Sequence, residues 1–193
     1  MNKKIGILLA AGTSSRFKND KPKQLYPING VPIIKHIINT MSSVVDILIV
    51  VINDKITLNY DNIIILKNNI NERKASLNTA ISYIQTHFKN TKKVIIHDAA
   101  RPFVTKAYFK KLIRQKQKYT QYAMKLTNGL YNIETNLPVD RDSYIELCTP
   151  ICISYDILKI QTTDEMLNSI DISPHFLFGH YNILRKITTI DDI

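Results

Sequence analysis

The sequence predicts an α/β protein with a mostly parallel sheet and helices on both faces of that sheet. Two observations lead to this prediction. Short apolar runs alternate along the chain with segments whose apolar residues recur at helical spacing, and this order is typical of parallel sheets with crossover helices. In addition, 45% of the 193 residues are hydrophobic and only 22% are charged, which is enough apolar material for one ordinary core. We therefore expect residues 1–193 to form a single domain.

The predicted strands are short segments dominated by apolar and β-branched residues. They run from Lys3 to Leu9, from Val44 to Ile52, from Asn62 to Leu66 and from Lys93 to His97. Continuous apolar runs, in place of strict alternation, indicate strands that are buried on both faces. Because parallel sheets bind ligands at the carboxyl ends of their strands, the residues that follow these segments are the first candidates for a site.

The predicted helices are segments in which apolar residues lie one or two turns apart. They run from Val31 to Met41, from Glu72 to Phe88 and from Thr105 to Tyr119. From about Gln121 to Thr149 the periodicity weakens into short polar and apolar pieces. We interpret residues 121–149 as a hairpin-like arm.

The chain is strongly basic, with 26 Lys and Arg against 16 Asp and Glu and a formal net charge of +10 at pH 7. Such a charge suits small anionic substrates, an acidic surface or nucleic acid. Much of the lysine lies on the polar side of predicted helices, as on solvated faces, and no motif combines basic and aromatic residues for nucleic-acid recognition. We therefore expect small anionic substrates and no nucleic-acid partner.

The apolar segments argue against a membrane or secreted protein, and the cysteines argue against a zinc-binding or disulfide-linked one. No segment approaches the length of a membrane span, and Met-Asn-Lys-Lys leads directly into a predicted core strand. We therefore expect no membrane association, no signal peptide and a cytoplasmic location. Cys148 and Cys152 have no His or Cys neighbours at metal-ligand spacing, so we expect packed thiols there, not a zinc site or a disulfide.

The first candidate site follows the first predicted strand. A run of small residues from Ala10 to Ser15 leads to Arg16, and the segment Lys21-Pro22-Lys23-Gln24 comes shortly after. Small side chains let backbone N–H groups approach a phosphate chain closely, and the basic residues add fixed positive charge. The run matches neither G-x-x-x-x-G-K-[ST] nor G-x-G-x-x-G. It predicts a triphosphate-binding loop, with a plain strand–helix connector as the alternative.

Other candidates follow a strand, begin a helix or lie near the C-terminus. Asp98 comes directly after a predicted strand, where a divalent cation that bridges phosphates would need an oxygen ligand, although helix capping is the alternative role. Arg101 could reach an anionic substrate, whereas His97 is more simply a packing residue. Ser76 lies in the first turn of a predicted helix, which suits a nucleotide base or ribose, or an ordinary helix start. Lys186 could reach back into the site or be exposed.

Taken together and in this order, the motifs resemble the 2-C-methyl-D-erythritol 4-phosphate cytidylyltransferase family, which includes the ribitol-5-phosphate cytidylyltransferases. The matching motifs are Ala10-Ala11-Gly12 with Arg16 and Pro22-Lys23-Gln24, Arg73 with Ser76, His97-Asp98-Ala99-Ala100-Arg101-Pro102, Asp140-Arg141 before Thr149-Pro150, and Lys186-Ile187-Thr188-Thr189. The order and rough spacing hold from about Lys4 to Val104 and return in patches to Ile193. The first loop paired with the His-Asp-Ala-Ala-Arg-Pro string is specific.

The resemblance implies a Rossmann-like, GT-A-like nucleotidyltransferase sheet. It also implies Mg²⁺ as a cofactor and attack of a small polyol phosphate on the α-phosphorus of CTP, with release of pyrophosphate. The favoured acceptor is 2-C-methyl-D-erythritol 4-phosphate, a substrate of isoprenoid biosynthesis, with ribitol 5-phosphate close behind. The arm would contribute to a homodimer and complete the acceptor pocket.

The resemblance further implies roles for particular residues. The catalytic cations at the triphosphate and its α-phosphorus would be Arg16, Lys23 and Lys186. The nucleotide-binding residues would be Ala10, Ala11, Gly12, Ser76 and Asp98, and Asp98 would also hold Mg²⁺. The residues facing the polyol phosphate would be Arg101, Arg141 and Thr149. Transfer of this kind needs positioning and charge stabilisation more than a covalent catalyst, which suits basic residues around one metal-binding carboxylate.

The sequence departs from the family pattern at a few positions. Ser14 stands where glycine is expected, Asn69-Ile70 where Gly-Gly is expected, and Ile151 where Gln is expected. Arg185 is an alternative to Lys186 as the C-terminal basic group. These departures leave two alternatives open, a nucleotide-binding homologue with impaired catalysis and a nucleotidyltransferase with altered base or acceptor choice.

Overall fold

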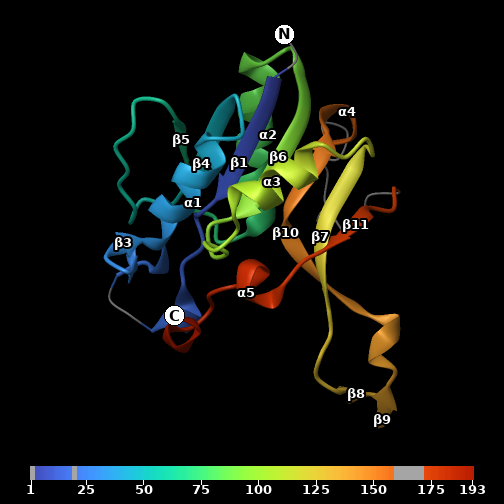
Figure 1. The fold of residues 1–193 in the computed structure, drawn as a ribbon. Helices are drawn as coiled ribbons and strands as arrows, with labels where there is room; N and C mark the ends of the chain where they lie inside the picture. The colour runs from blue at the N-terminus through green and yellow to red at the C-terminus, as the bar shows by residue number, and fades with distance from the viewer. Residues whose placement is uncertain (1–2, 19–20, 159–171) are drawn as a thin grey trace.

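The structure is a computed structural model that describes residues 3–18, 21–158 and 172–193 (Figure 1). Within this part, seven strands form the central sheet in the order β11-β7-β10-β6-β1-β4-β5. Their bounds are β1 (Lys3–Leu9), β4 (Ile47–Ile52), β5 (Ile64–Lys67), β6 (Thr91–Asp98), β7 (Tyr119–Lys125), β10 (Ile145–Ser154) and β11 (His175–Phe178). All neighbouring strands are parallel except that β10 is antiparallel to both β6 and β7. The predicted α/β class with a mostly parallel sheet is confirmed.

Helices cover both faces of this sheet because alternate strand residues point to opposite sides. The helices are α1 (Ile33–Ser42), α2 (Arg73–His87), α3 (Lys106–Ile113), α4 (Tyr155–Leu158) and α5 (Tyr181–Leu184). The core residues of α1, α3 and α5 share one cluster with Ile95 of β6. Those of α2 and α4 share the opposite cluster with Val94 and Ile96. The two apolar layers hold β1, β4 and β6 as a rigid platform.

A short hairpin precedes α1 and delays its start. β2 (Pro27–Ile28) and β3 (Val31–Pro32) pair across Asn29 and Gly30, whose φ angles are 49° and 78°. Left-handed backbone at both central residues is what a two-residue turn of this kind requires, and Asn-Gly adopts it readily. The helix predicted from Val31 therefore begins at Ile33.

The helix predicted from Thr105 to Tyr119 is too long. It ends at Ile113, and Tyr119 begins β7. The five residues from 114 to 118 are Arg, Gln, Lys, Gln and Lys, so no apolar side chain continues the buried stripe through another turn. The other predicted strands and the helix from Glu72 to Phe88 are confirmed with ends shifted by a few residues.

The arm is shorter than predicted. Residues 121–125 and 145–149, which the sequence pattern assigns to the arm, belong to β7 and β10 of the central sheet. Beyond them, β8 (Leu130–Asn132), β9 (Leu137–Val139) and the 3-10 turn η3 (Arg141–Ser143) extend away from the sheet (Figure 1). The arm proper is therefore residues 126–144.

The two cysteines have the surroundings predicted for them. Cys148 and Cys152 lie buried in β10 as free thiols, which confirms the prediction of packed cysteines. Burial raises the pKa of each thiol to about 11. Among the described residues, no helix combines the length and the apolar character needed to cross a bilayer.

The two-layer core predicts a large cost for truncating a central strand residue. Ile95 is 0% exposed, so Ile95→Ala should lower the free energy of unfolding by about 2–5 kcal/mol through the cavity it leaves. Ile133 in the arm is 89% exposed, and Ile133→Ala should change it by less than about 0.5 kcal/mol. Urea denaturation measures both variants, and equal losses would contradict this description of the core.

Candidate active site

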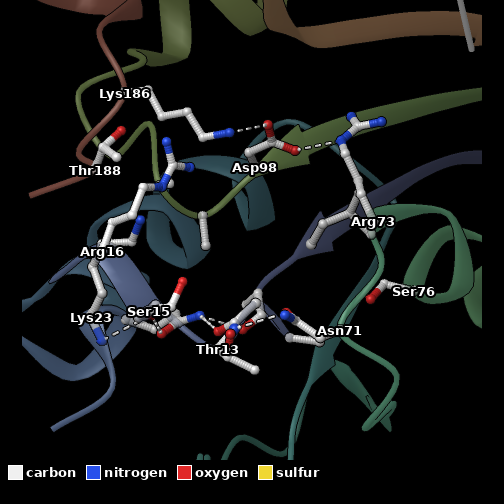
Figure 2. A pocket seen from close by; sticks show the side chains of 18 of the residues that line it. Thr13, Ser15, Arg16, Lys23, Asn71, Arg73, Ser76, Asp98, Lys186 and Thr188 are labelled. Carbon is white, nitrogen blue, oxygen red and sulfur yellow. Dashed lines mark hydrogen bonds and ion pairs between the residues drawn. The ribbon is translucent and has the colours of Figure 1, made fainter. Parts of the chain in front are cut away.

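A pocket opens at the carboxyl ends of β1 and β6 and has a volume of about 310 Å³ (Figure 2). Backbone hydrogen bonds extend the sheet into its rim, since the N–H of Ala10 donates to the Val51 carbonyl and that of Ala99 to the Leu9 carbonyl. The predicted residues that line the pocket are Ala10, Ala11, Gly12, Arg16, Lys23, Ser76, Asp98 and Lys186. The structure therefore brings together the residues predicted for the triphosphate, the nucleoside and the metal.

Phe17 anchors the loop that follows β1. Its side chain is buried in a small cluster with Ile28, Ile33 and Ile187. The backbone just before it turns sharply at Ser14, where φ is 59° and ψ is 30°. Arg16, which lies between these two points in the turn η1 (Ser15–Phe17), lines the pocket.

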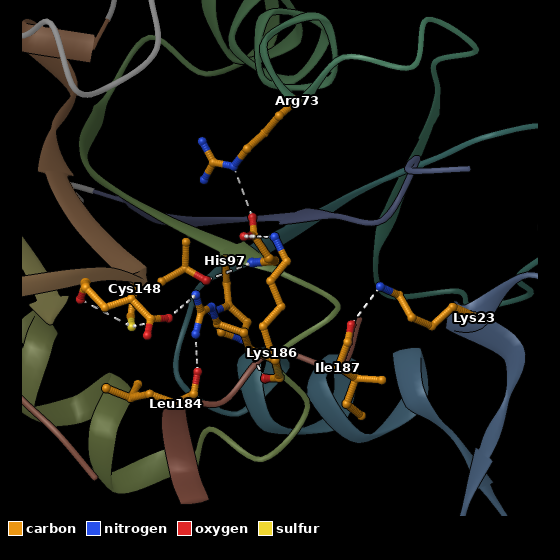
Figure 3. A network of polar contacts seen from close by, with 11 residues as sticks. Lys23, Arg73, His97, Cys148, Leu184, Lys186 and Ile187 are labelled. Carbon is orange, nitrogen blue, oxygen red and sulfur yellow. Dashed lines mark hydrogen bonds and ion pairs between the residues drawn. The ribbon is translucent and has the colours of Figure 1, made fainter. Parts of the chain in front are cut away.

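Lys23 lies in a crowd of positive charge. Its Nζ donates a hydrogen bond of 2.7 Å to the carbonyl of Ile187, which joins the N-terminal loop to the C-terminal segment (Figure 3). Burial, followed by the charges of Lys186 and Arg16, lowers the pKa of Lys23 to about 8. A nearby anion would stabilise the charged form of this amine, because opposite charges attract and the anion would offset the repulsion from the other cations.

Asp98 is the carboxylate at the centre of this charge. It ends β6, and its side chain lies between Arg73, whose Nε is 3.2 Å away, and Lys186, whose Nζ is 3.8 Å away (Figure 2). Burial alone would raise the pKa of the Asp98 carboxyl, but the charges of Arg73 and Lys186 hold it below the usual value of 3.8. Asp98 is therefore ionised at neutral pH.

The C-terminal segment is held in place from three sides, and this explains how Lys186 reaches the pocket. The N–H of Ile187 donates to the carbonyl of Ala100 at 2.8 Å, and the Ile187 side chain is fully buried. The Asp192 carboxylate accepts hydrogen bonds from the backbone N–H groups of Thr188 and Thr189 at 2.6 and 2.8 Å. Lys186, and not Arg185, lines the pocket.

Arg185 instead lies over the ring of Phe103, with 4.4 Å between its guanidinium carbon and the ring centroid. This contact is a cation–π interaction, and neither of its residues lines the pocket. The alternative assignment of Arg185 as the C-terminal basic group of the pocket therefore finds no support in the structure.

The residues predicted to face the polyol phosphate do not line the pocket. Arg101 is 6% exposed, donates to the carbonyl of Leu184 and lies 3.6 Å from a carboxylate oxygen of Glu146. Arg141 lies in the arm and donates to the carbonyl of Thr127 at 2.6 Å. The Thr149 hydroxyl is buried and accepts from the backbone N–H of Asp98 at 3.2 Å. Their role in acceptor binding remains a prediction.

The structure adds Arg73 to the candidate site. The spacing of Arg73 and Ser76 contained the signal, since residues three apart share one face of a helix and both line the pocket from the first turn of α2. His97 has the surroundings of the packing residue predicted from the sequence. Burial lowers its pKa to about 4, and the neutral ring contacts the carbonyl of Arg101 at 3.0 Å through Nε2.

A metal ion in this pocket would depend on Asp98. Among the described residues, no group of three or more His, Cys, Asp or Glu side chains could hold a metal. Mg²⁺ in nucleotide sites is commonly held by one or two carboxylates together with phosphate oxygens and water. An ionised Asp98 next to a group of cationic side chains fits that donor set, so a metal would be shared between this side chain and a phosphate ligand.

Comparisons with known proteins place the chain in a family. The family model described as 2-C-methyl-D-erythritol 4-phosphate cytidylyltransferase matches residues 5–192. A protein of that name from Clostridium botulinum (strain ATCC 19397 / Type A) is 31% identical over 225 aligned positions, which cover 100% of this chain and 95% of that protein. One from Aliivibrio fischeri (strain MJ11) is 36% identical over 117 positions, 56% of this chain and about half (49%) of that protein's length.

The fold is also found among solved structures. The bifunctional IspDF from Campylobacter jejuni superposes with a TM-score of 0.83 at 22% sequence identity, and the match covers 99% of this chain and 53% of that one. At this level of identity the likeness establishes the fold, while the family model and the Clostridium relative establish the family. The chain belongs to the 2-C-methyl-D-erythritol 4-phosphate cytidylyltransferase family of nucleotidyltransferases.

Proposed function

We propose that this chain transfers the cytidylyl group of CTP to 2-C-methyl-D-erythritol 4-phosphate and releases pyrophosphate. The observation that carries the proposal is the pocket, where four cationic side chains lie with Asp98 beside a loop of small residues. Those cations are Arg16, Lys23, Arg73 and Lys186. The names of the relatives supply the acceptor and the cytidylyl group, and the pocket supplies the charge that a triphosphate needs.

The pocket has two ends that suit the two ends of a nucleotide. Arg16 and Lys23 lie on one side, and Asn71 and Ser76 lie on the other (Figure 2). We place the triphosphate on the cationic side and the nucleoside near the first turn of α2. Lys186 then lies on the triphosphate side of Asp98, where charge develops during transfer.

The chemistry is an exchange of one P–O bond for another. An oxygen of the acceptor phosphate forms a bond to the α-phosphorus, and the bond from that phosphorus to the oxygen of the β-phosphate breaks. Pyrophosphate leaves with the electron pair. The cations of the pocket would stabilise the charge on the α-phosphoryl oxygens and on the leaving pyrophosphate, which is the main requirement of phosphoryl-type transfer.

We also propose Mg²⁺ as the cofactor and Asp98 as its protein ligand. The ion, when bound, would shield the phosphate charges from one another and from the incoming acceptor. Arg73 has a supporting role here, because its guanidinium keeps the Asp98 carboxyl ionised. Asp98→Asn should therefore lower the turnover rate and also make that rate less dependent on the Mg²⁺ concentration.

A second copy of the chain would complete the acceptor side. The arm leaves large apolar side chains open to solvent, and Tyr131, Ile133 and Leu137 are 57%, 89% and 61% exposed. Arg141 lies in the same arm, outside the pocket of its own chain. We propose a homodimer in which the arm of one copy lies against the other, so that the acceptor phosphate meets residues of both.

The assay that tests the proposed function measures pyrophosphate release from purified protein, Mg²⁺, each of four nucleoside triphosphates and each polyol phosphate. We expect release with CTP and 2-C-methyl-D-erythritol 4-phosphate. Release with ribitol 5-phosphate instead would correct the acceptor. Binding of CTP without release for any acceptor would indicate a homologue that has lost catalysis, and retention on DNA that weakens steeply with salt would indicate a nucleic-acid binder.

Removing the charge of Lys23 should slow the reaction. Lys23→Ala should lower kcat/KM by more than tenfold, because a charge-assisted contact at the reacting phosphate is worth more than about 1.4 kcal/mol. Lys111→Ala, which removes an exposed lysine of α3, serves as the control and should leave the rate unchanged. Steady-state kinetics with varied CTP measures both, and an unchanged rate for Lys23→Ala would remove this residue from the mechanism.

The pKa of Lys23 predicts a pH dependence for nucleotide binding. With a pKa of about 8 in the free protein, Lys23 is mostly charged at pH 7 and mostly neutral at pH 9. CTP should therefore bind about tenfold more weakly at pH 9 than at pH 7. Lys23→Arg keeps its charge over this range and should remove most of the dependence. Calorimetric titration with CTP at both pH values measures the affinity of each protein. The same change with pH for wild type and Lys23→Arg would contradict the role given to the charge of Lys23.

A further inference from the structure

The side chain of Gln24 is turned toward the loop that follows β1. It is only 5% exposed, and its Nε2 donates to the carbonyls of Ala10 and Gly12 at 2.7 and 2.9 Å. Its Oε1 accepts a hydrogen bond of 3.1 Å from the hydroxyl of Ser14. Both donors of this amide and its oxygen are therefore used on one stretch of five residues.

These bonds determine which way the loop's peptide groups face. In a trans peptide the carbonyl and the following N–H point in opposite directions. When Gln24 holds the carbonyls of Ala10 and Gly12, the N–H groups of Ala11 and Thr13 face away from Gln24. The N–H of Thr13 is directed to the side where Asn71 lines the pocket, and it donates to Oδ1 of that residue at 3.3 Å. A bound phosphate oxygen would replace this acceptor.

A second amide holds the carbonyl between these two. Nδ2 of Asn53, which is 7% exposed, donates to the carbonyl of Ala11 at 2.9 Å. Three successive carbonyl oxygens are thus bound by protein amides, so none of them is left to repel an anion at the loop. A loop that binds phosphate needs its N–H groups directed at the ligand and its carbonyls turned away.

Ser14 connects this arrangement to Lys23. Its hydroxyl donates to Gln24 and accepts from the backbone N–H of Lys23 at 3.3 Å. Because Oε1 of Gln24 accepts this bond, its NH₂ group is directed at the two carbonyls. Ser14 has left-handed backbone, which glycine also adopts freely, so Ser14→Gly would remove the hydroxyl without straining the turn.

We propose that Gln24, fixed by Ser14, is a positioning residue that holds the carbonyls of Ala10 and Gly12 away from the pocket so that the loop presents N–H groups to the triphosphate. The proposal rests on the proposed function for the identity of the anion. Gln24 acts through the backbone it holds, so its loss should affect nucleotide binding and leave the affinity for the acceptor unchanged.

The sharpest test replaces the two donors of Gln24 by acceptors. Gln24→Glu has nearly the same shape, but its carboxylate cannot donate and would face two carbonyl oxygens. We expect KM for CTP and the Kd for inorganic tripolyphosphate to rise by more than tenfold, with KM for the acceptor within twofold of wild type. Gln121→Glu is the control, because Gln121 is also buried, at 4% exposed, but lies in β7 away from the pocket lining.

Ser14→Gly keeps the proposal testable if Gln24→Glu does not fold. Loss of one hydrogen bond to the amide should raise KM for CTP about threefold to tenfold and speed amide hydrogen exchange in residues 10–14. Unchanged exchange and an unchanged KM would overturn the proposal. If wild type binds tripolyphosphate and both variants bind it equally well, the positioning role fails while the proposed function survives. If wild type binds neither tripolyphosphate nor CTP, both fail.

Discussion

The mutual repulsion of cations in one pocket is the constraint that the rest of the site must offset. Arg16, Lys23 and Lys186 are near enough for Lys186 and Arg16 to lower the pKa of Lys23. Asp98 offsets part of this repulsion, because its carboxylate pairs with both Arg73 and Lys186. A polyanion would offset the rest. An arrangement of charges like this one would become more favourable if a polyanion bound there.

The fold holds these charges together by joining distant parts of the chain at backbone groups. Ile187 does this most directly, since its side chain belongs to the same buried cluster as Phe17, its N–H donates to the Ala100 carbonyl and its own carbonyl accepts from Lys23. The parallel strands β1 and β6 meanwhile place the first loop and Asp98 at one edge of the sheet. Both ends of the chain thus contribute to one site, and the loop between β1 and α1 is held by side-chain amides as well as by the sheet.

Much of this could be predicted from the sequence, and the exceptions have physical reasons. Strands buried on both faces leave continuous apolar runs, and the residues after them, such as Asp98, could be placed at the sheet edge without a structure. The role of Gln24 could not, because it depends on contacts with carbonyls ten or more residues away. The buried position of Arg101, where it meets the Leu184 carbonyl and Glu146, is equally a result of tertiary packing. The position of Arg141 depends on the path of the arm, and the local sequence periodicity does not define that path.

The most direct test of the account is a crystal structure of the chain with CTP and Mg²⁺. The account predicts the triphosphate in the pocket between the loop of residues 10–16 and Lys186, with the ion on Asp98 and the cytosine toward Asn71 and Ser76. A nucleotide bound elsewhere, or one whose triphosphate leaves Arg16, Lys23 and Lys186 without contacts, would contradict it.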